Sequence, residues 1–203
     1  MWNFKYKNQY LNYVSDLMQD TAVQSMRLLP QHRAGVSCYH HSVLVSYASW
    51  RVCDWLGLDA RAADSWSGLL HDFYLYNWRD AASHPGIRHG SQHPEVALRN
   101  ARARFSLTWR EEDIILSHMF PYTPTKVYRC LESAVVSTMD KLCAAAELVG
   151  LVPLLTRFRR ETPLLAGRRL GSYPAAQGRL IPRRMSSEIR IFIRFLRLRP
   201  QET

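Results

Sequence analysis

Apolar side chains recur at helical spacing along much of the chain. Two early segments, residues 9–28 and 39–56, each carry one apolar stripe, and Pro30 and Gly57 follow them as stop signals. This spacing predicts two amphipathic helices. Residues 60–72 are rich in alanine, and we predict a third helix there.

A less regular stretch follows the third predicted helix. Residues 73–92 begin with aromatic side chains and end in glycine, proline and histidine, which predicts a long loop of the kind that often carries function. We expect His93 and Pro94 to begin the next helix, because proline fits the first helical turn.

Two further helices complete the pattern. Thr108 and Glu111 have capping-box spacing, which predicts a helix that runs to about Met119. A longer helix is predicted over residues 126–148, ending at Gly150. Because the chain shows neither an alternating strand pattern nor an internal repeat, we predict an all-α fold.

Charge divides the chain into two parts. Residues 1–155 carry 15 Lys and Arg against 14 Asp and Glu, whereas residues 156–203 carry 12 Arg, no Lys and three Glu. We therefore predict a nearly neutral helical domain over residues 1–155 and a basic, Arg-rich C-terminal extension over residues 156–203. The extension ends in SSEIRIFIRFLRLRP, whose alternation suits a strand or a partner-bound segment. Only this extension could bind nucleic-acid phosphates.

The cysteines and the hydrophobic runs bear on location. The four cysteines are scattered without a CxxC pair, which favours a reducing compartment over a disulfide framework. The start of the chain, MWNFKYKNQY, lacks the apolar core of a signal peptide. No run approaches the roughly 18–20 apolar residues of a membrane span. We expect a cytoplasmic protein with no membrane span.

Titratable side chains fall on apolar stripes of different predicted helices. His41, His118 and Asp140 each lie three or four residues from apolar positions, and Asp72 lies in the apolar stretch GLLHDFYLYNW. One such residue alone is more often a hydrogen-bonded core residue than a ligand. Several imidazoles and two carboxylates in one bundle interior would lack partners without a cation. Together they indicate a metal site.

These stretches resemble an HD-domain metal-dependent phosphohydrolase, over roughly residues 39–148. The resemblance is carried in order by HHSVLVSYASWRVCDWLGLD, RAADSWSGLLHD, HPEVALRNA, EEDIILSHMFP and STMDKLCAAAE. The family has a histidine, a His-Asp pair and a distal aspartate, and it implies an HD-domain helical bundle. The matching residues are His41, His71, Asp72 and Asp140.

Two more histidines resemble the extra ligands of the binuclear subgroup, which includes HD-GYP enzymes and diadenosine polyphosphate hydrolases. They are His93 and His118, although the HD-GYP signature itself is absent. Two assignments stay open, because His40 adjoins His41 and His89 lies close to His93. The closest overall resemblance is to small stand-alone HD-domain proteins.

The resemblance implies hydrolysis of a phosphoester or phosphoanhydride, with a nucleotide as the favoured substrate, by a metal-activated water. Asp72 would bridge two ions, with His41, His71 and Asp140 on one and His93 and His118 on the other; without the latter two, one ion would bind. Fe or Mn is favoured, with Zn, Co, Ni or Mg as alternatives.

The substrate contacts are less well defined by the pattern. The family often has a phosphate-contacting lysine three residues after the His-Asp pair, and Leu75 stands there. Arg79, Arg88 or Lys141 could replace it, with Arg79 and Lys141 as catalytic candidates. The aromatic loop could stack a nucleobase or simply pack in the core; its residues are Phe73, Tyr74, Tyr76 and Trp78.

Two other functions remain open at this level. The helical domain could be a nucleotide-binding or sensor module on an HD scaffold with little activity. The Arg-rich extension could instead make the protein a binder of RNA or another anionic surface. The sequence leaves the oligomeric state open.

Overall fold

A computed structural model describes residues 4–59 and 66–150. The regular secondary structure of this part of the chain is all helical, as predicted. It contains no strand, only one isolated bridge between Pro30 and Ser37. In chain order the elements are α1 (Phe4–Gln19), α2 (Thr21–Ser25), η1 (Met26–Leu28), α3 (Cys38–Leu56), α4 (Gly68–Leu70), η3 (Ala81–Ser83), α5 (His89–Arg102), α6 (Trp109–Ser117) and α7 (Leu131–Leu148).

The first predicted helix is wrong as one continuous element. It breaks at Asp20, whose side chain accepts hydrogen bonds from the backbone N–H groups of Ala22 and Val23 and so caps α2. A side-chain cap offers the backbone an alternative to a continuous helix. The second prediction is confirmed, because α3 ends at Gly57, which adopts a left-handed φ of 71°.

Helix α5 begins at His89, four residues before the predicted start. Its first turn is held by Gln92, whose backbone N–H donates to Arg88 O at 2.9 Å and whose side-chain oxygen accepts from Arg88 N at 2.6 Å. Pro94 therefore lies inside the helix. Of the predicted third helix, residues 60–65 lie outside the described part, and the structure describes only the short α4 near its end.

The capping box of α6 is confirmed, with Thr108 and Glu111 bonded reciprocally. Helix α7 begins at Leu131, later than predicted. The segment before it is held by buried Asp113, whose Oδ2 accepts hydrogen bonds from Arg129 N at 2.9 Å and from Ser133 Oγ at 2.6 Å. Asp113 thus satisfies the backbone N–H of Arg129 without a helical hydrogen bond, and α7 begins two residues later.

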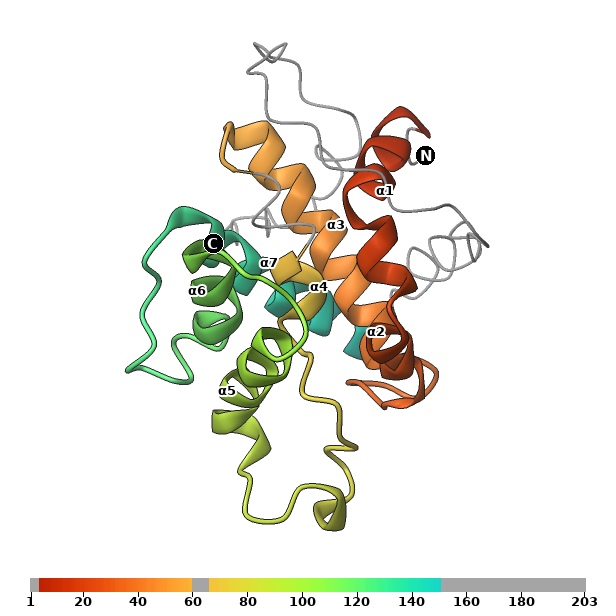
Figure 1. Cartoon of the computed structure of the whole chain (residues 1–203), viewed down its shortest axis with the longest axis vertical. Helices are drawn as coiled ribbons and strands as arrows, with labels where there is room; N and C mark the ends of the chain where they lie inside the picture. The colour runs from red at the N-terminus through yellow and green to blue at the C-terminus, as the bar shows by residue number, and fades with distance from the viewer. Residues whose placement is uncertain (1–3, 60–65, 151–203) are drawn as a thin grey trace, which may run out of the picture.

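Helix α3 is the central element of the bundle. It packs against α4 and α7, while α6 packs against both α5 and α7. Figure 1 shows α1 and α2 on one side of α3 and α5 and α6 on the other. The larger apolar core joins α1, α3, α4 and α5, and a smaller one lies between α3, α6 and α7. The polar cluster described below lies among α3, α4, α5, α6 and α7.

None of the helices in the described ranges is long and apolar enough to cross a membrane. The predicted Arg-rich extension, residues 156–203, lies outside the described residues, and so does its predicted boundary at residue 155.

Candidate metal centre

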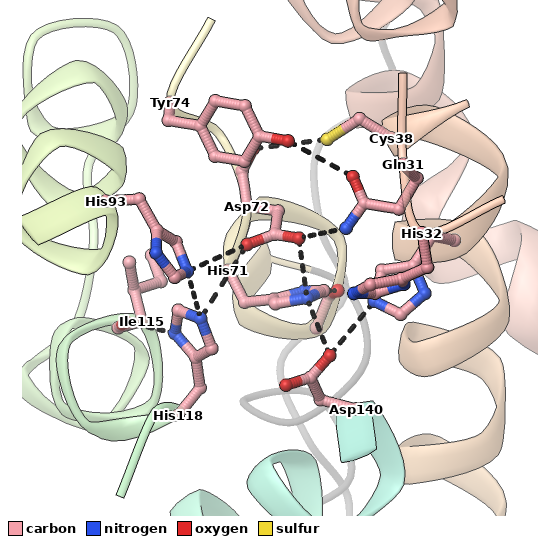
Figure 2. A network of polar contacts seen from close by, with 12 residues as sticks. Gln31, His32, Cys38, His71, Asp72, Tyr74, His93, Ile115, His118 and Asp140 are labelled. Atoms are coloured by element: carbon pink, nitrogen blue, oxygen red, sulfur yellow. Dashed lines mark hydrogen bonds and ion pairs between the residues drawn. The ribbon is translucent and has the colours of Figure 1, made fainter. Parts of the chain in front are cut away.

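Six side chains predicted as metal ligands converge in the interior of the bundle (Figure 2). They come from α3, from the turn after α4, from α5, from the C-terminal end of α6 and from α7. Taken as whole residues, none of the six is more than 8% exposed. They are His41, His71, Asp72, His93, His118 and Asp140.

The first half of the cluster is formed by His41, His71 and Asp140. Asp140 Oδ1 lies 3.0 Å from His41 Nε2 and 3.6 Å from His71 Nε2. Asp140 is on the inward face of α7, and His41 is on the face of α3 that packs against it. The three donor atoms lie within 4.8 Å of one another, which is compatible with one shared ion.

The second half is formed by Asp72, His93 and His118. Asp72 Oδ1 lies 3.3 Å from His93 Nε2 and 3.7 Å from His118 Nε2. The other carboxylate oxygen, Oδ2, lies 3.5 Å from His71 Nε2. Asp72 therefore contacts both halves, and Figure 2 shows it between His93 and His118 on one side and His71 on the other.

Each of the four histidines uses Nδ1 to donate a hydrogen bond to an acceptor outside the donor cluster. His71 donates to Gly68 O at 2.9 Å, His93 to His89 O at 2.7 Å and His118 to Ile115 O at 2.8 Å. His41 donates to the Glu147 carboxylate at 2.8 Å. Such outer partners fix ring orientation and direct Nε2 toward a metal. All four Nε2 atoms face the cluster.

The Nε2 atoms show that the donor set fits a cation. His93 Nε2 and His118 Nε2 lie 2.9 Å apart, although both rings carry their proton on Nδ1 if that nitrogen donates to the carbonyl. Two lone pairs then face each other. His71 Nε2 is buried without a hydrogen-bond partner. Buried polar atoms normally have partners, so these atoms fit a bound metal ion.

The electrostatics of the two halves differ. Burial alone would raise the pKa values of Asp72 and Asp140, but the imidazoles around them hold both well below their usual range. Burial would lower the pKa of His41, yet its hydrogen bonds to Asp140 and Glu147 raise it to about 10. Burial and neighbouring imidazoles lower the pKa of His118 to about 3. The carboxylates therefore stay charged, and the second half keeps a neutral imidazole as a potential ligand.

The structure distinguishes the neighbouring histidines. His41 lies in the cluster, whereas His40 contacts Ser37 Oγ at 2.8 Å, outside it. His93 lies in the cluster, whereas the His89 ring contacts Tyr76 OH at 3.0 Å. The geometry thus favours His41 and His93 as the ligands.

Two of the three basic residues predicted to contact substrate, Lys141 and Arg79, bond to protein acceptors. Lys141 Nζ donates to His118 O at 2.8 Å, to Ser137 O at 3.2 Å and to Ser137 Oγ at 2.6 Å. An ammonium has three protons, so these bonds can use all of them. Arg79 donates to Gln31 O at 2.6 Å. Arg88 is the N-cap residue of α5 and is exposed.

The aromatic loop packs largely against histidines. Tyr76 stacks on His84, with ring centroids 4.6 Å apart, and Trp78 stacks on His89 at 5.4 Å. Phe73 and Tyr74 are buried in the larger core. Between the tyrosines, Leu75 has a left-handed φ of 58°, which is costly for a side chain with a Cβ. The stacking contacts favour the core-packing interpretation of this loop.

Three residues of the site were missed from the sequence: Gln31, His32 and Glu147. Gln31 Nε2 donates to Asp72 Oδ2 at 2.7 Å, and Tyr74 OH donates to Gln31 Oε1 at 3.1 Å. His32 Nδ1 and Glu147 Oε2 are 2.9 Å apart. Glu147 lies seven positions after Asp140, so helical spacing could have placed both on one face of α7. Gln31 and His32 lie in a loop that gave no periodic signal.

Replacing Gln31 with Leu should destabilise the metal-free protein by about 1–3 kcal/mol, because the hydrogen bonds to the buried Asp72 and Tyr74 side chains are lost. Urea unfolding in the presence of a chelator measures the change. Gln9→Leu on the exposed surface of α1 is the control and should change stability by less than about 0.5 kcal/mol. Equal unfolding free energies for the two variants would contradict this role for Gln31.

No protein-family model, curated protein or solved structure matches this chain. The evidence for a function is therefore the geometry of the cluster and the order of its residues in the sequence.

Proposed function

We propose that this protein is a metal-dependent phosphohydrolase of HD-domain type, which cleaves a phosphoester or phosphoanhydride of a small molecule, with a nucleotide as the favoured substrate. The observation that carries the proposal is the convergence of four imidazole Nε2 atoms on two buried carboxylates, with His93 and His118 only 2.9 Å apart. This donor set, in an all-α bundle, matches what the sequence resemblance implies.

The six candidate ligands form two groups, each of which would hold one metal ion. His41, His71 and Asp140 would hold one ion, and Asp72, His93 and His118 the other, with Asp72 in contact with both groups. A divalent ion in such a site acidifies water and neutralises charge on phosphoryl oxygens. Mixed imidazole and carboxylate donors favour Fe or Mn, and also suit Zn, Co or Ni better than Mg.

The protein's own contribution is orientation and exclusion of water. The Nδ1 hydrogen bonds fix the four rings, and Gln31 fixes the Asp72 carboxylate. The side chains of Asp72 and Asp140 are 7% and 11% exposed, so the cluster is almost closed to bulk solvent. A low-dielectric, ordered site strengthens interactions with a phosphoryl group.

The test is elemental analysis of the purified protein, followed by a screen of nucleotides and other phosphoesters with each candidate metal. We expect one or two equivalents of bound metal and turnover of at least one phosphorylated compound. A protein that binds no transition metal and hydrolyses none of them would overturn the proposal.

One observation favours a second candidate, a metal-containing binding or sensor module. Lys141 Nζ already donates to three protein acceptors, so it has no proton left for a phosphate in the described arrangement. In this case the protein would bind metal and a nucleotide without turnover. Equilibrium binding of the screened nucleotides to the metal-loaded protein separates the two candidates.

Removal of the basic extension tests whether it takes part in the chemistry. A chain that ends at residue 155 should keep metal binding and hydrolysis within about twofold, because every residue of the cluster precedes Gly150. Any RNA binding should be lost, because the extension carries 12 of the basic residues. Turnover that disappears while the metal stays bound would place a catalytic contribution in the extension.

A further inference from the structure

Glu147 is a fully buried carboxylate that accepts hydrogen bonds from two histidines. His41 Nδ1 donates to its Oε1 at 2.8 Å, and His32 Nδ1 donates to its Oε2 at 2.9 Å. The side chains of His41 and Glu147 are 0% exposed, whereas that of His32 is 31% exposed. Burying an unpaired carboxylate is costly, so these two bonds explain how Glu147 is tolerated in the interior.

The same contacts hold the His41 ring at both nitrogens. Asp140 and Glu147 lie two turns apart on α7, and the ring of His41 on α3 fits between them. Asp140 Oδ1 lies 3.0 Å from Nε2, and Glu147 Oε1 lies 2.8 Å from Nδ1. The ring therefore cannot rotate without losing an ion pair. His32 supports the outer oxygen of Glu147, and its ring lies edge-on to that of His41, with centroids 4.8 Å apart.

We propose that Glu147 is a positioning residue, supported by His32, which orients His41 and increases its strength as a metal ligand. This inference rests on the proposed metal site. An outer carboxylate bonded to a ligating histidine fixes which nitrogen binds the metal and raises ligand basicity. Glu147 contacts only the half of the cluster that contains His41, His71 and Asp140, so its effect is specific to that half.

The same atoms could be taken for a third metal site, because His32, His41 and Glu147 offer donors within 4.8 Å of one another. The hydrogen bonds argue against it, since Glu147 already receives an N–H group on each oxygen. If Glu147 is a positioning residue and not a ligand, we expect no more than two ions per chain.

Glu147→Gln tests the proposal, because the amide keeps the size and an acceptor oxygen but loses the charge. Zn²⁺ affinity is measured by competition with a chromophoric chelator, in full-length protein. We expect an affinity loss of about 10- to 100-fold for one ion. Glu132→Gln is the matched control, since Glu132 is also buried on α7 but bonds to Asp59 N, away from the cluster.

Two backgrounds assign the loss to one half of the cluster. With His118→Asn, which disables the second half, Glu147→Gln should still weaken the remaining ion. With Asp140→Asn, which disables the first half, it should have no effect. Equal losses in both backgrounds, no loss in either, or a third Zn²⁺ ion per chain would overturn the proposal.

A milder variant guards against loss of the fold. His32 lies in a loop, so we expect the His32→Ala protein to fold as the parent does. We expect its Zn²⁺ affinity for the same ion to fall by about two- to tenfold. An unchanged affinity in a folded His32→Ala protein would refute the supporting role of His32. If the parent protein binds no Zn²⁺, Fe or Mn, the proposed function fails and this inference fails with it. If the parent binds metal and the Glu147 and His32 variants bind it equally tightly, the inference alone fails.

Discussion

Asp72→Ala should abolish metal binding and phosphohydrolase turnover together. Its Oδ1 lies 3.3 Å from His93 Nε2 and its Oδ2 lies 3.5 Å from His71 Nε2, so one carboxylate connects the two halves of the cluster. Loss of an outer-sphere partner typically costs about 10- to 100-fold in metal affinity or activity, and loss of a direct ligand shared by both halves should cost more. Elemental analysis and turnover of the same preparation measure both effects.

Asp113→Asn is the matched control for this experiment. Asp113 is also a buried aspartate, but its carboxylate bonds to Ser133 Oγ and Arg129 N at the start of α7, away from the cluster. We expect this variant to be less stable than the parent but to keep its metal. If Asp72→Ala kept full metal content and full turnover, the proposed metal centre would be wrong.

The fold was predictable where local side-chain chemistry and periodicity agree. Helix α3 has an apolar stripe, a serine N-cap and a C-terminal glycine, and its bounds were predicted within a residue. The predicted helix boundaries are wrong where a side chain forms a hydrogen bond that the apolar pattern does not indicate. Asp20 interrupts the first apolar run by capping α2, and Asp113 of α6 holds the chain before α7. The second of these bonds joins different elements, so no local pattern contains it.

The candidate ligands were predictable because their types and order resemble a known pattern, and the structure brings all six together. The hydrogen-bond partners of these ligands were not predictable. Glu147 meets His41 and His32 across more than 100 intervening residues, and Gln31 meets Asp72 across about 40. These pairs depend on how α3, α7 and an irregular loop pack. Helical spacing could place Glu147 on the same face of α7 as Asp140, but it does not identify the histidines that Glu147 contacts, and the loop that holds Gln31 has no periodic pattern.

The predicted substrate contacts illustrate a different limit. Lys141 and Arg79 are cations near the motif in the sequence, yet sequence proximity does not say which acceptor a flexible cation reaches. In the structure Lys141 joins α7 to the end of α6, and Arg79 joins the aromatic loop to the Gln31 backbone. Both contacts stabilise the shell around the cluster.

Removal of the metal should markedly destabilise the protein. A ligand that binds only the folded state stabilises it by RT ln(1 + [L]/Kd), which is about 2.7 kcal/mol at a free concentration 100 times Kd. Without a cation, His93 Nε2 and His118 Nε2 face each other at 2.9 Å, and His71 Nε2 stays buried without a hydrogen-bond partner. Urea unfolding with excess Mn²⁺ and with a chelator should therefore differ by about 2–4 kcal/mol.

The destabilisation must depend on the cluster to support this interpretation. In Asp72→Ala the two unfolding curves should coincide, because the variant cannot use the added Mn²⁺, whereas in Asp113→Asn the difference should persist. The sign is also fixed: Mn²⁺ must raise the free energy of unfolding, since the unfolded chain does not bring the histidines and carboxylates together. Identical curves for the parent with Mn²⁺ and with chelator would show that these six side chains form a self-sufficient polar core, because no binding energy would then be linked to folding.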